Sequence, residues 1–368
     1  MGWVRRMKPL ILTLILLSVV SVFAQAPAAQ PDQGYPPFIK GADLSLLESL
    51  QDRGVQYLEN GQVKDPLLIF KDYGCNYIRL RIFVNPDGTR GQVNSLAYTI
   101  GLAERVKKMG MGFLLDFHYS DKWADPGKQF VPAAWQNLTH AQLTDQVYNY
   151  TKDTLAAFKQ AGCMPDMVQV GNEITNGMDW PDGGSLKEAT KWDNFADLVK
   201  AGVKAVREAG PMKIIIHVDR GGTIGVSKWF FENLTKRNVD FDIIGLSFYP
   251  FDNGTLDDLA ANLTYLSNTY GKDIVIAETG YFAEGGSAGK NPFPTTPQGQ
   301  KDFMDGLMET VAATPGGHGR GIFYWAPEWI RGAGYKRSGP TSNRALFDDT
   351  GNALPAMQSF GFELAPTK

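Results

Sequence analysis

The chain has 368 residues and a net charge of −3, with 43% of its residues apolar and 20% charged. This length and composition fit one large globular domain or two small ones, and the charge excludes the basic surface that binding to nucleic acid requires. The two cysteines, Cys75 and Cys163, are too few for a disulfide scaffold, and whether they pair in an exported protein is left open.

The first residues have the features of an export signal. Arg5, Arg6 and Lys8 precede an apolar run over residues 9–20, and the small residue Ala24 offers a cleavage site. The alternative is a membrane anchor, but the run is short for a span. We therefore expect a signal peptide over residues 1–24, a tether over 25–37, and a secreted or periplasmic protein with no stable membrane association.

Strand and helix patterns alternate from residue 38 onward. Short runs rich in Val, Ile and Leu predict buried strands, and caps and stops such as Asp65-Pro66 and Gly74 bound the helices. The expected strands cover residues 38–43, 77–83, 112–118, 167–170, 213–218, 242–249, 273–278 and 321–325. The expected helices cover residues 65–73, 95–109, 140–161, 191–209, 227–237, 256–270, 298–314 and 353–360.

Eight strands alternating with eight helices predict an α/β fold with a parallel sheet. The count of eight favours a single (β/α)8 TIM barrel over residues 38–362, followed by a tail over 363–368. An open doubly wound sheet is the alternative, although no Gly-rich phosphate loop follows the first strand.

Polar and aromatic side chains fall at the carboxyl ends of successive strands, where barrels carry their active sites. Each has an ordinary structural explanation alone, such as an arginine paired with a core carboxylate. Burying so many together costs several kcal/mol unless they pair or face water, so their coincidence favours a functional site. The candidates are Asp43, Arg79, Arg81, Asp116, His118, Trp123, Asn172, Glu173, Trp180, His217, Asp219, Tyr249, Glu278 and Trp325.

Two chemistries suit these residues. His118 and His217, with Asp116 and Asp219, resemble metal ligands, although no H-E-x-x-H motif is present. Glycoside hydrolysis fits better, because Glu173 and Glu278 end the fourth and seventh strands on opposite sides of the ring. Two such carboxyls can approach to about 5–5.5 Å, the spacing of retaining enzymes.

The surroundings of the two glutamates suggest separate roles. We expect Arg79 or Arg81, with Tyr249, to keep Glu278 ionised, and we expect Glu173 to keep a raised pKa and act as the acid. Asn172 is expected at a sugar hydroxyl. Indole rings are expected to stack on sugar faces, and those near this end are Trp123, Trp135, Trp180, Trp325 and Trp329.

These residues resemble the barrel clan of retaining β-glycosidases and, within it, glycoside hydrolase family 53, the arabinogalactan endo-β-1,4-galactanases. The resemblance covers nearly all of residues 38–362. It implies that Glu173 is the acid/base and Glu278 the nucleophile, that the anomeric configuration is retained, and that β-1,4-galactan is the substrate. The matching motifs are K-G-A-D at 40–43, N-Y-I-R-L-R at 76–81, D-F-H-Y-S-D-K-W-A-D-P-G-K-Q at 116–129, V-Q-V-G-N-E-I-T-N-G at 168–177, I-G-L-S-F-Y-P at 244–250 and E-T at 278–279.

Departures from the family pattern are concentrated late in the chain. The family's tryptophan after the strand-six Tyr-Pro is replaced by Phe251-Asp252-Asn253, and its E-T-A-Y-P ends here in Gly280-Tyr281-Phe282. Its W-E-P becomes Trp325-Ala326-Pro327, with Glu328 following, and a W-x-N-Q-like segment becomes Ser342-Asn343-Arg344. Asp179 stands before Trp180 where an apolar residue is usual. These changes concern substrate choice and leave the glutamate pair intact.

The expected partner is therefore a polysaccharide, galactan or arabinogalactan, and the expected state is a monomer without cofactor or metal. Some family members bind calcium after strand seven, but residues 281–297 lack an acidic cluster. Two alternatives remain, namely a retaining β-glycanase for another polysaccharide and a barrel that binds glycan without cleaving it.

Overall fold

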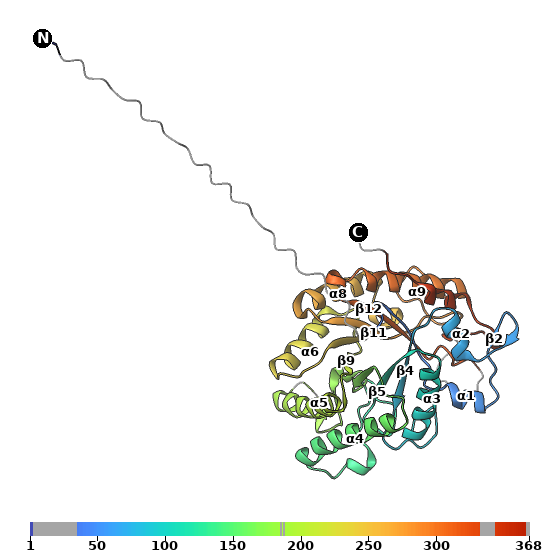
Figure 1. Cartoon of the computed structure of the whole chain (residues 1–368), viewed down its shortest axis with the longest axis horizontal. Coiled ribbons are helices and arrows are strands. Elements are labelled where there is room, and N and C mark those ends of the chain that lie inside the picture. The colour runs from blue at the N-terminus through green and yellow to red at the C-terminus, as the bar shows by residue number, and fades with distance from the viewer. Residues whose placement is uncertain (3–34, 185, 187, 332–342, 366–368) are drawn as a thin grey trace.

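A computed structural model describes residues 1–2, 35–184, 186, 188–331 and 343–365 of the chain. The predicted signal peptide (apart from residues 1–2), most of the predicted tether, Ser342 and the end of the predicted tail lie outside the described residues. Within them, strands and helices alternate along the chain around one central sheet (Figure 1).

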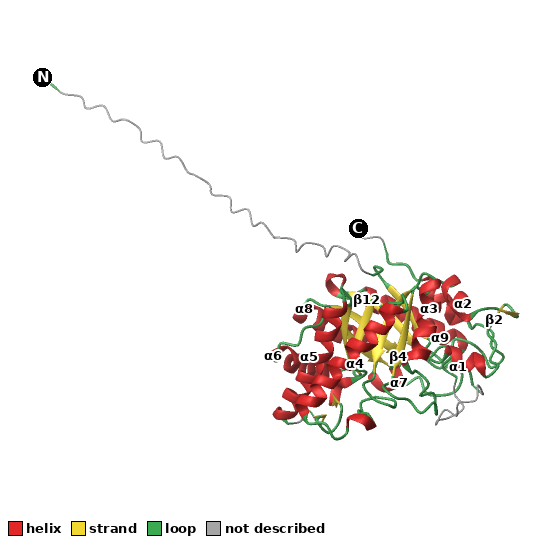
Figure 2. Ribbon diagram, turned by 60° about the horizontal axis from the view of Figure 1, so that its bottom comes forward, coloured by secondary structure: helices red, strands yellow, loops and turns green. Residues whose placement is uncertain are grey.

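The sheet is a closed barrel of parallel strands in the order β1-β12-β11-β10-β9-β6-β5-β4. Each strand that the sequence predicts is present, which confirms the (β/α)8 barrel. Figure 2 shows the strands enclosed by helices. The strands are β1 (Ile39–Asp43), β4 (Tyr77–Ile82), β5 (Gly112–Phe117), β6 (Met167–Val170), β9 (Lys213–Val218), β10 (Ile243–Phe248), β11 (Asp273–Thr279) and β12 (Gly319–Trp325).

Five of the helices around the barrel begin at capping residues that their sequences supply. Side chains of Asp65, Ser95 and Thr296 each accept a hydrogen bond from a first-turn N–H group, and Thr139 and Thr255 form capping boxes. The helices are α2 (Pro66–Asp72), α3 (Leu96–Lys108), α4 (His140–Gln160), α5 (Ala189–Ala209), α6 (Ile224–Lys236), α8 (Leu256–Tyr270) and α9 (Pro297–Ala312).

Short elements in the loops were not predicted. They are α1 (Leu47–Asp52), the hairpins β2 (Leu58–Glu59) with β3 (Gln62–Val63) and β7 (Gly177–Met178) with β8 (Gly183–Gly184), the helix α7 (Pro250–Asn253), and the 3-10 helices η1 (Ala133–Trp135), η2 (Ile174–Asn176) and η3 (Pro315–Gly317).

The prediction of a closing α-helix over residues 353–360 is wrong. Residues 355–361 form a 3-10 helix, η4 (Pro355–Gly361), instead of an α-helix. A segment this short between a proline and a glycine gains little from an α-helical ladder. Its buried Met357 and Phe360 hold it against the barrel instead.

The apolar core has two parts. One lies between the strands and the helices, and the other fills the barrel interior with side chains that include Tyr77 and Phe323. Gly112 leaves room for the first ring, because a Cβ there would lie 2.1 Å from it. The interior is therefore plugged with apolar groups below the polar strand ends.

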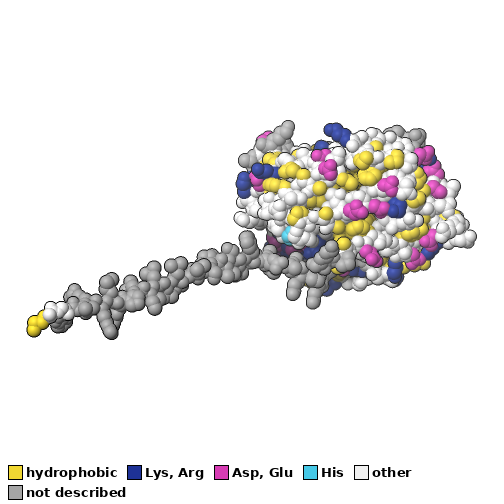
Figure 3. Space-filling view, turned by 90° about the horizontal axis from the view of Figure 1, so that it is seen from above, with side chains coloured by type: hydrophobic (Ala, Val, Ile, Leu, Met, Phe, Trp, Pro, Cys, Tyr) yellow, Lys and Arg dark blue, Asp and Glu magenta, His cyan; other side chains and the backbone are white. Residues whose placement is uncertain are grey.

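Both cysteines are buried free thiols, so Cys75 and Cys163 do not pair in this structure. On the face shown in Figure 3, acidic and basic side chains are scattered among apolar ones. Among the described residues, the helices are all too short or too polar to cross a bilayer.

Candidate active site

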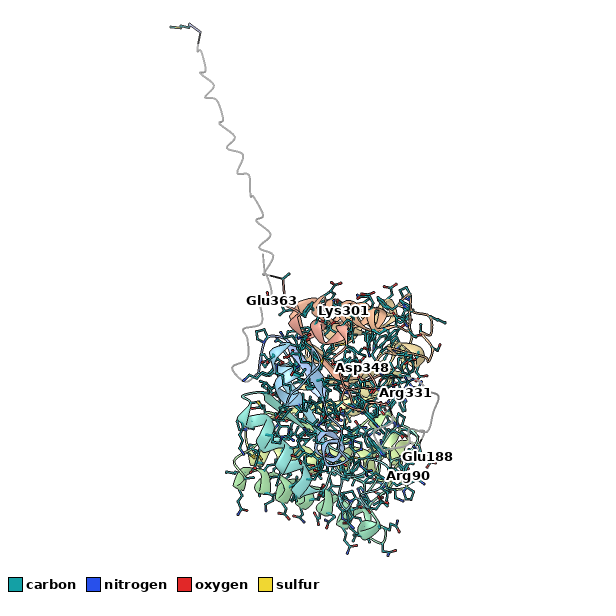
Figure 4. All side chains as sticks on the ribbon, turned by 90° about the vertical axis from the view of Figure 1, so that its right-hand side faces the viewer. Arg90, Glu188, Lys301, Arg331, Asp348 and Glu363 are labelled. Carbon is teal, nitrogen blue, oxygen red and sulfur yellow. The ribbon has the colours of Figure 1, made fainter. Side chains whose placement is uncertain are left out.

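The loops at the carboxyl ends of the strands form the mouth of the barrel. Arg90, Glu188 and Arg331 belong to the loops that follow β4, β6 and β12, and all three lie at the right-hand side of the view in Figure 4. The polar residues that the sequence placed at strand ends lie at this mouth, and most of them contact one another.

Arg79, in β4, is the centre of these contacts. It is 1% exposed, and its Nη1 lies 2.7 Å from Asp43 Oδ2. Its Nη2 lies 2.8 Å from Asp116 Oδ2 and 3.0 Å from Glu278 Oε1, and it donates to Asn172 Oδ1 at 2.7 Å. One guanidinium therefore ties four strands together and provides the positive charge that three buried carboxylates need.

Glu278 lies next to the last residue of β11, and both of its carboxyl oxygens have a partner. Besides the Arg79 contact, its Oε2 accepts a hydrogen bond from the Tyr249 hydroxyl at 3.1 Å. Burial raises the pKa of Glu278 to about 7, and Arg79 and Tyr249 oppose this rise. Of the two arginines considered for this role, Arg79 contacts Glu278, whereas Arg81 lies over the Trp123 ring at 4.1 Å.

Glu173 follows β6 in the left-handed backbone region, at φ 48°, which is uncommon for a side chain of this kind. It is partly exposed, and its Oε1 accepts a hydrogen bond from the Ser247 hydroxyl at 2.6 Å. Burial, and then the charge of Glu278, raise the pKa of Glu173 well above its usual range. No arginine or lysine among the described residues forms an ion pair with it. The protonated form is therefore favoured.

Ser247 and His217 both form hydrogen bonds to Glu173. The Glu173 N–H group donates to His217 Nδ1 at 3.3 Å, so the ring proton lies on Nε2, which is 2.9 Å from Ser247 Oγ. Burial, and then Arg79, lower the pKa of His217 well below its usual range, which keeps the ring neutral. His217 Nε2 then donates a hydrogen bond to Ser247 Oγ, and the Ser247 hydroxyl donates one to Glu173 Oε1. Ser247 was missing from the predicted site, because a serine in a buried strand looks like a space-filling residue.

A second network lies around Asp116. Its Oδ2 is 3.0 Å from His118 Nε2, and its Oδ1 accepts from Gln169 Nε2 at 2.6 Å. Gln169, in the middle of β6, was also not predicted. The Asn172 amide donates to the Ala124 carbonyl at 2.9 Å, so protein groups hold the orientation of this side chain.

The residues considered as metal ligands are not arranged as a ligand set. His217 uses both ring nitrogens in the contacts above, and His118 Nδ1 accepts from the Ala124 N–H group at 3.0 Å. Asp219 turns toward Arg220, 2.9 Å away. No group of three or more potential ligands is found within residues 35–184, 186, 188–331 and 343–365.

The tryptophans separate into three groups. Trp123, Trp325 and Trp329 form a run with ring centroids 6.2 and 6.1 Å apart. Trp180 lies on the rim, where its indole donates to the Asn176 carbonyl at 3.0 Å and lines a pocket with Pro181 and Lys191. Trp135 is 5% exposed and packs edge-on against Tyr150, so it is not available to a sugar.

A (β/α)8 barrel with two glutamates at its mouth, one in surroundings that favour the acid and one beside an arginine, defines the class of barrel glycoside hydrolases. The chain belongs to glycosyl hydrolase family 53, whose family model matches residues 39–360. The resemblance stated from the motifs is thus confirmed, and the protein is a glycoside hydrolase.

Several known proteins are similar to this chain. An endo-beta-1,4-galactanase of Bacillus subtilis is 36% identical over 88% of this chain and 86% of its own length. An arabinogalactan endo-beta-1,4-galactanase of Cellvibrio japonicus is 34% identical over 88% and 90%. The catalytic domain of an Ignisphaera aggregans family 53 enzyme superimposes with a TM-score of 0.81 at 38% identity, covering 90% of this chain and 98% of that domain.

Proposed function

We propose that this enzyme is an endo-acting galactanase that cleaves β-1,4-galactosidic bonds in galactan or arabinogalactan with retention of configuration. Relatives described as galactanases, which match over more than four fifths of this chain, support the reaction. The observation that carries the mechanism is the contrast between the two glutamates, because Glu278 has a cation and a phenol on its oxygens and Glu173 has neither.

In the first step, a Glu278 oxygen attacks the anomeric carbon and the bond to the leaving sugar breaks. Glu173 gives its proton to the leaving oxygen, so a free sugar hydroxyl departs and a glycosyl ester forms on Glu278. Arg79 and Tyr249 fix the direction of the attacking oxygen. The Ser247 hydroxyl stabilises the carboxylate that Glu173 becomes.

In the second step, Glu173 acts as a base. It takes a proton from a water molecule, whose oxygen attacks the anomeric carbon and displaces Glu278 as a carboxylate. Two inversions give net retention and return both glutamates to their starting states. Asn172, held by Arg79 and Ala124, is placed to contact the sugar hydroxyl next to the reacting carbon, and Trp325 and Trp123 are placed to stack on sugar faces.

The test is cleavage of purified linear β-1,4-galactan, with new reducing ends as the readout and NMR of the first products as the measure of configuration. Glu278→Ala and Glu173→Ala should each lower kcat at least 1,000-fold (about 4 kcal/mol) with the fold unchanged. Glu232→Gln, on the exposed part of α6, is the control. Full turnover by Glu278→Ala, or inverted products, would sink the mechanism.

We also propose that the protein is exported, through residues 1–24, and acts as a monomer on its polysaccharide. The length distribution of early products separates the endo mode from release of single sugars at a chain end. The same assay on xylan and mannan tests the alternative substrates. Binding of galactan without any product over long incubation would instead indicate a glycan-binding barrel.

A further inference from the structure

The barrel mouth carries a cation that the proposed mechanism does not use. Arg344 follows β12 in the chain and is partly exposed. Its guanidinium carbon lies between 5.5 and 5.7 Å from the centroids of four aromatic rings, within the range of cation–π attraction. These rings, called the aromatic cage below, belong to Tyr249, Phe251, Phe282 and Trp325.

Within the described part of the chain, the charge on Arg344 is not paired with a carboxylate. Among the described residues, no acidic group lies within ion-pair distance of it, and its side chain donates no hydrogen bond. Its main chain, by contrast, is fixed, because its carbonyl oxygen accepts from the Tyr324 hydroxyl at 2.8 Å. A guanidinium has five N–H donors, and those of Arg344 are free to bind a ligand beside the site because its side chain is partly exposed.

The cage adjoins the reacting groups directly. The Tyr249 hydroxyl donates a hydrogen bond to Glu278, and the Arg344 guanidinium carbon lies 5.6 Å from the centroid of the Tyr249 ring. Trp325, placed to stack on a sugar, lies 5.5 Å from the same guanidinium. One ring therefore separates Arg344 from the proposed nucleophile, which places it within reach of a sugar unit beside the scissile bond.

Three members of this arrangement coincide with departures from the family motifs. Phe251, Phe282 and Arg344 come from the loops after β10, β11 and β12, far apart in sequence. In space they meet, since the two phenylalanine rings lie 4.8 Å apart and Arg344 lies over both. Differences that converge on one point beside the site indicate a changed contact with the substrate.

We propose that Arg344 binds a carboxylate on a sugar unit next to the scissile bond, so that this enzyme acts on galactan carrying uronic-acid units. The proposal rests on the proposed galactanase function. The planar guanidinium fits a carboxylate through two parallel hydrogen bonds, and the cage holds the plane in place. A neutral sugar would leave the charge unused.

The experiment compares linear β-1,4-galactan with the same polymer partly oxidised at C6 to carboxylates, and kcat/KM is measured on both. Arg344→Gln should lower the ratio of oxidised to neutral kcat/KM roughly tenfold, the loss expected for a hydrogen bond to a charged group. Arg344→Lys keeps the positive charge but cannot form two parallel hydrogen bonds, so its ratio of oxidised to neutral kcat/KM should lie between those of the wild type and Arg344→Gln. The control is Arg331→Gln, a nearby arginine already paired with Glu284 at 2.8 Å and labelled in Figure 4, which should leave the ratio unchanged.

A second measurement needs no variant. Mass spectrometry of products from the oxidised polymer should show the acidic unit enriched at one fixed distance from the cut, and 0.5 M salt should weaken that enrichment. Random placement of the acid, or an unchanged ratio in a folded Arg344→Gln, would overturn the inference while neutral galactan is still cleaved. If the wild-type enzyme leaves neutral galactan intact, the proposed function itself fails.

Discussion

At the scale of single residues, the small side chain of Ser247 affects the pKa of Glu173. It donates to Glu173 at 2.6 Å, and this hydrogen bond lowers the pKa of Glu173 against burial and the charge of Glu278. In the proposed mechanism, the active form needs Glu173 protonated and Glu278 ionised. The acidic limb of the rate profile therefore follows Glu278 and the alkaline limb follows Glu173.

Ser247→Ala should shift the alkaline limb of kcat/KM to higher pH and lower kcat several-fold. Without the donated hydrogen bond the ionised form of Glu173 loses support, so its pKa rises and the proton is held longer. The measurement is a pH profile of galactan cleavage. Ser267→Ala is the matched control, because this α8 residue also carries a hydroxyl that donates a hydrogen bond, here to the Pro315 carbonyl far from Glu173. A shift of the alkaline limb to lower pH would contradict the assignment.

The sequence could name most residues of the candidate site but not the contacts between them. Arg79 and Arg81 are two residues apart in β4 and therefore lie on one face of the strand, and both contact Asp43. Which of them reaches Glu278 depends on the relative register of β4 and β11, which are not neighbours in the barrel and which no local pattern encodes. Ser247 and Gln169 lie within the matching motifs and Arg344 within a departure from them, but no sequence pattern shows which residues on other strands each of them contacts.

At the scale of elements, Glu328 joins the end of β12 to the start of α1. Its Oε1 accepts from the Leu46 N–H group at 3.0 Å, and its carbonyl accepts from the Tyr57 hydroxyl at 2.8 Å. Burial, and then the charge of Asp43, raise the pKa of Glu328 to about 8. The folded protein therefore keeps this proton to a higher pH than the unfolded chain, where the pKa is about 4.3.

The contribution of Glu328 is complete below the unfolded pKa and is lost as the pH rises toward 8, at no more than about 1.4 kcal/mol per pH unit. Glu328→Gln removes the titration, so the fall in Tm between pH 5.5 and 8.5 should be a few degrees smaller in the variant. Glu309→Gln, exposed on α9, is the control. An equal fall in wild type and variant would show that Glu328 is not buried as an acid.

Most of the barrel helices were predictable because they are long and periodic, and five helices begin at a side-chain cap. The strands were predictable because they are apolar runs that alternate with the helices. The elements that were missed are short, and tertiary contacts hold them. Helix α1 begins at Leu47 without a side-chain cap, and its buried Leu47 and Leu50 supply the packing that the local sequence does not announce. The same reason explains η4, whose buried Met357 and Phe360 fix a segment with weak helical preference.

At the scale of the whole molecule, the barrel closes where its first strand meets its last. Gly321 of β12 pairs with Ile39 of β1, and its φ of 126° is one that other residues rarely adopt. A Cβ at this position would lie 2.0 Å from the Ile39 carbonyl oxygen. Both the backbone angle and the limited space require glycine. The pairing of β1 with β12, whose residues are about 280 positions apart in the chain, therefore depends on the absence of a side chain at residue 321.

Gly321→Ala should therefore lower the free energy of unfolding by roughly 3 kcal/mol or more, because either the backbone angle or the β1–β12 pairing must give way. The measurement is urea unfolding, in which the midpoint should fall while the slope stays constant if the barrel still closes. Gly225→Ala is the control, since this helical position in α6 has open space around it. It should leave stability unchanged or raise it by up to about 1 kcal/mol. Equal midpoints for the two variants would mean that the seam tolerates a side chain and that barrel closure does not depend on Gly321.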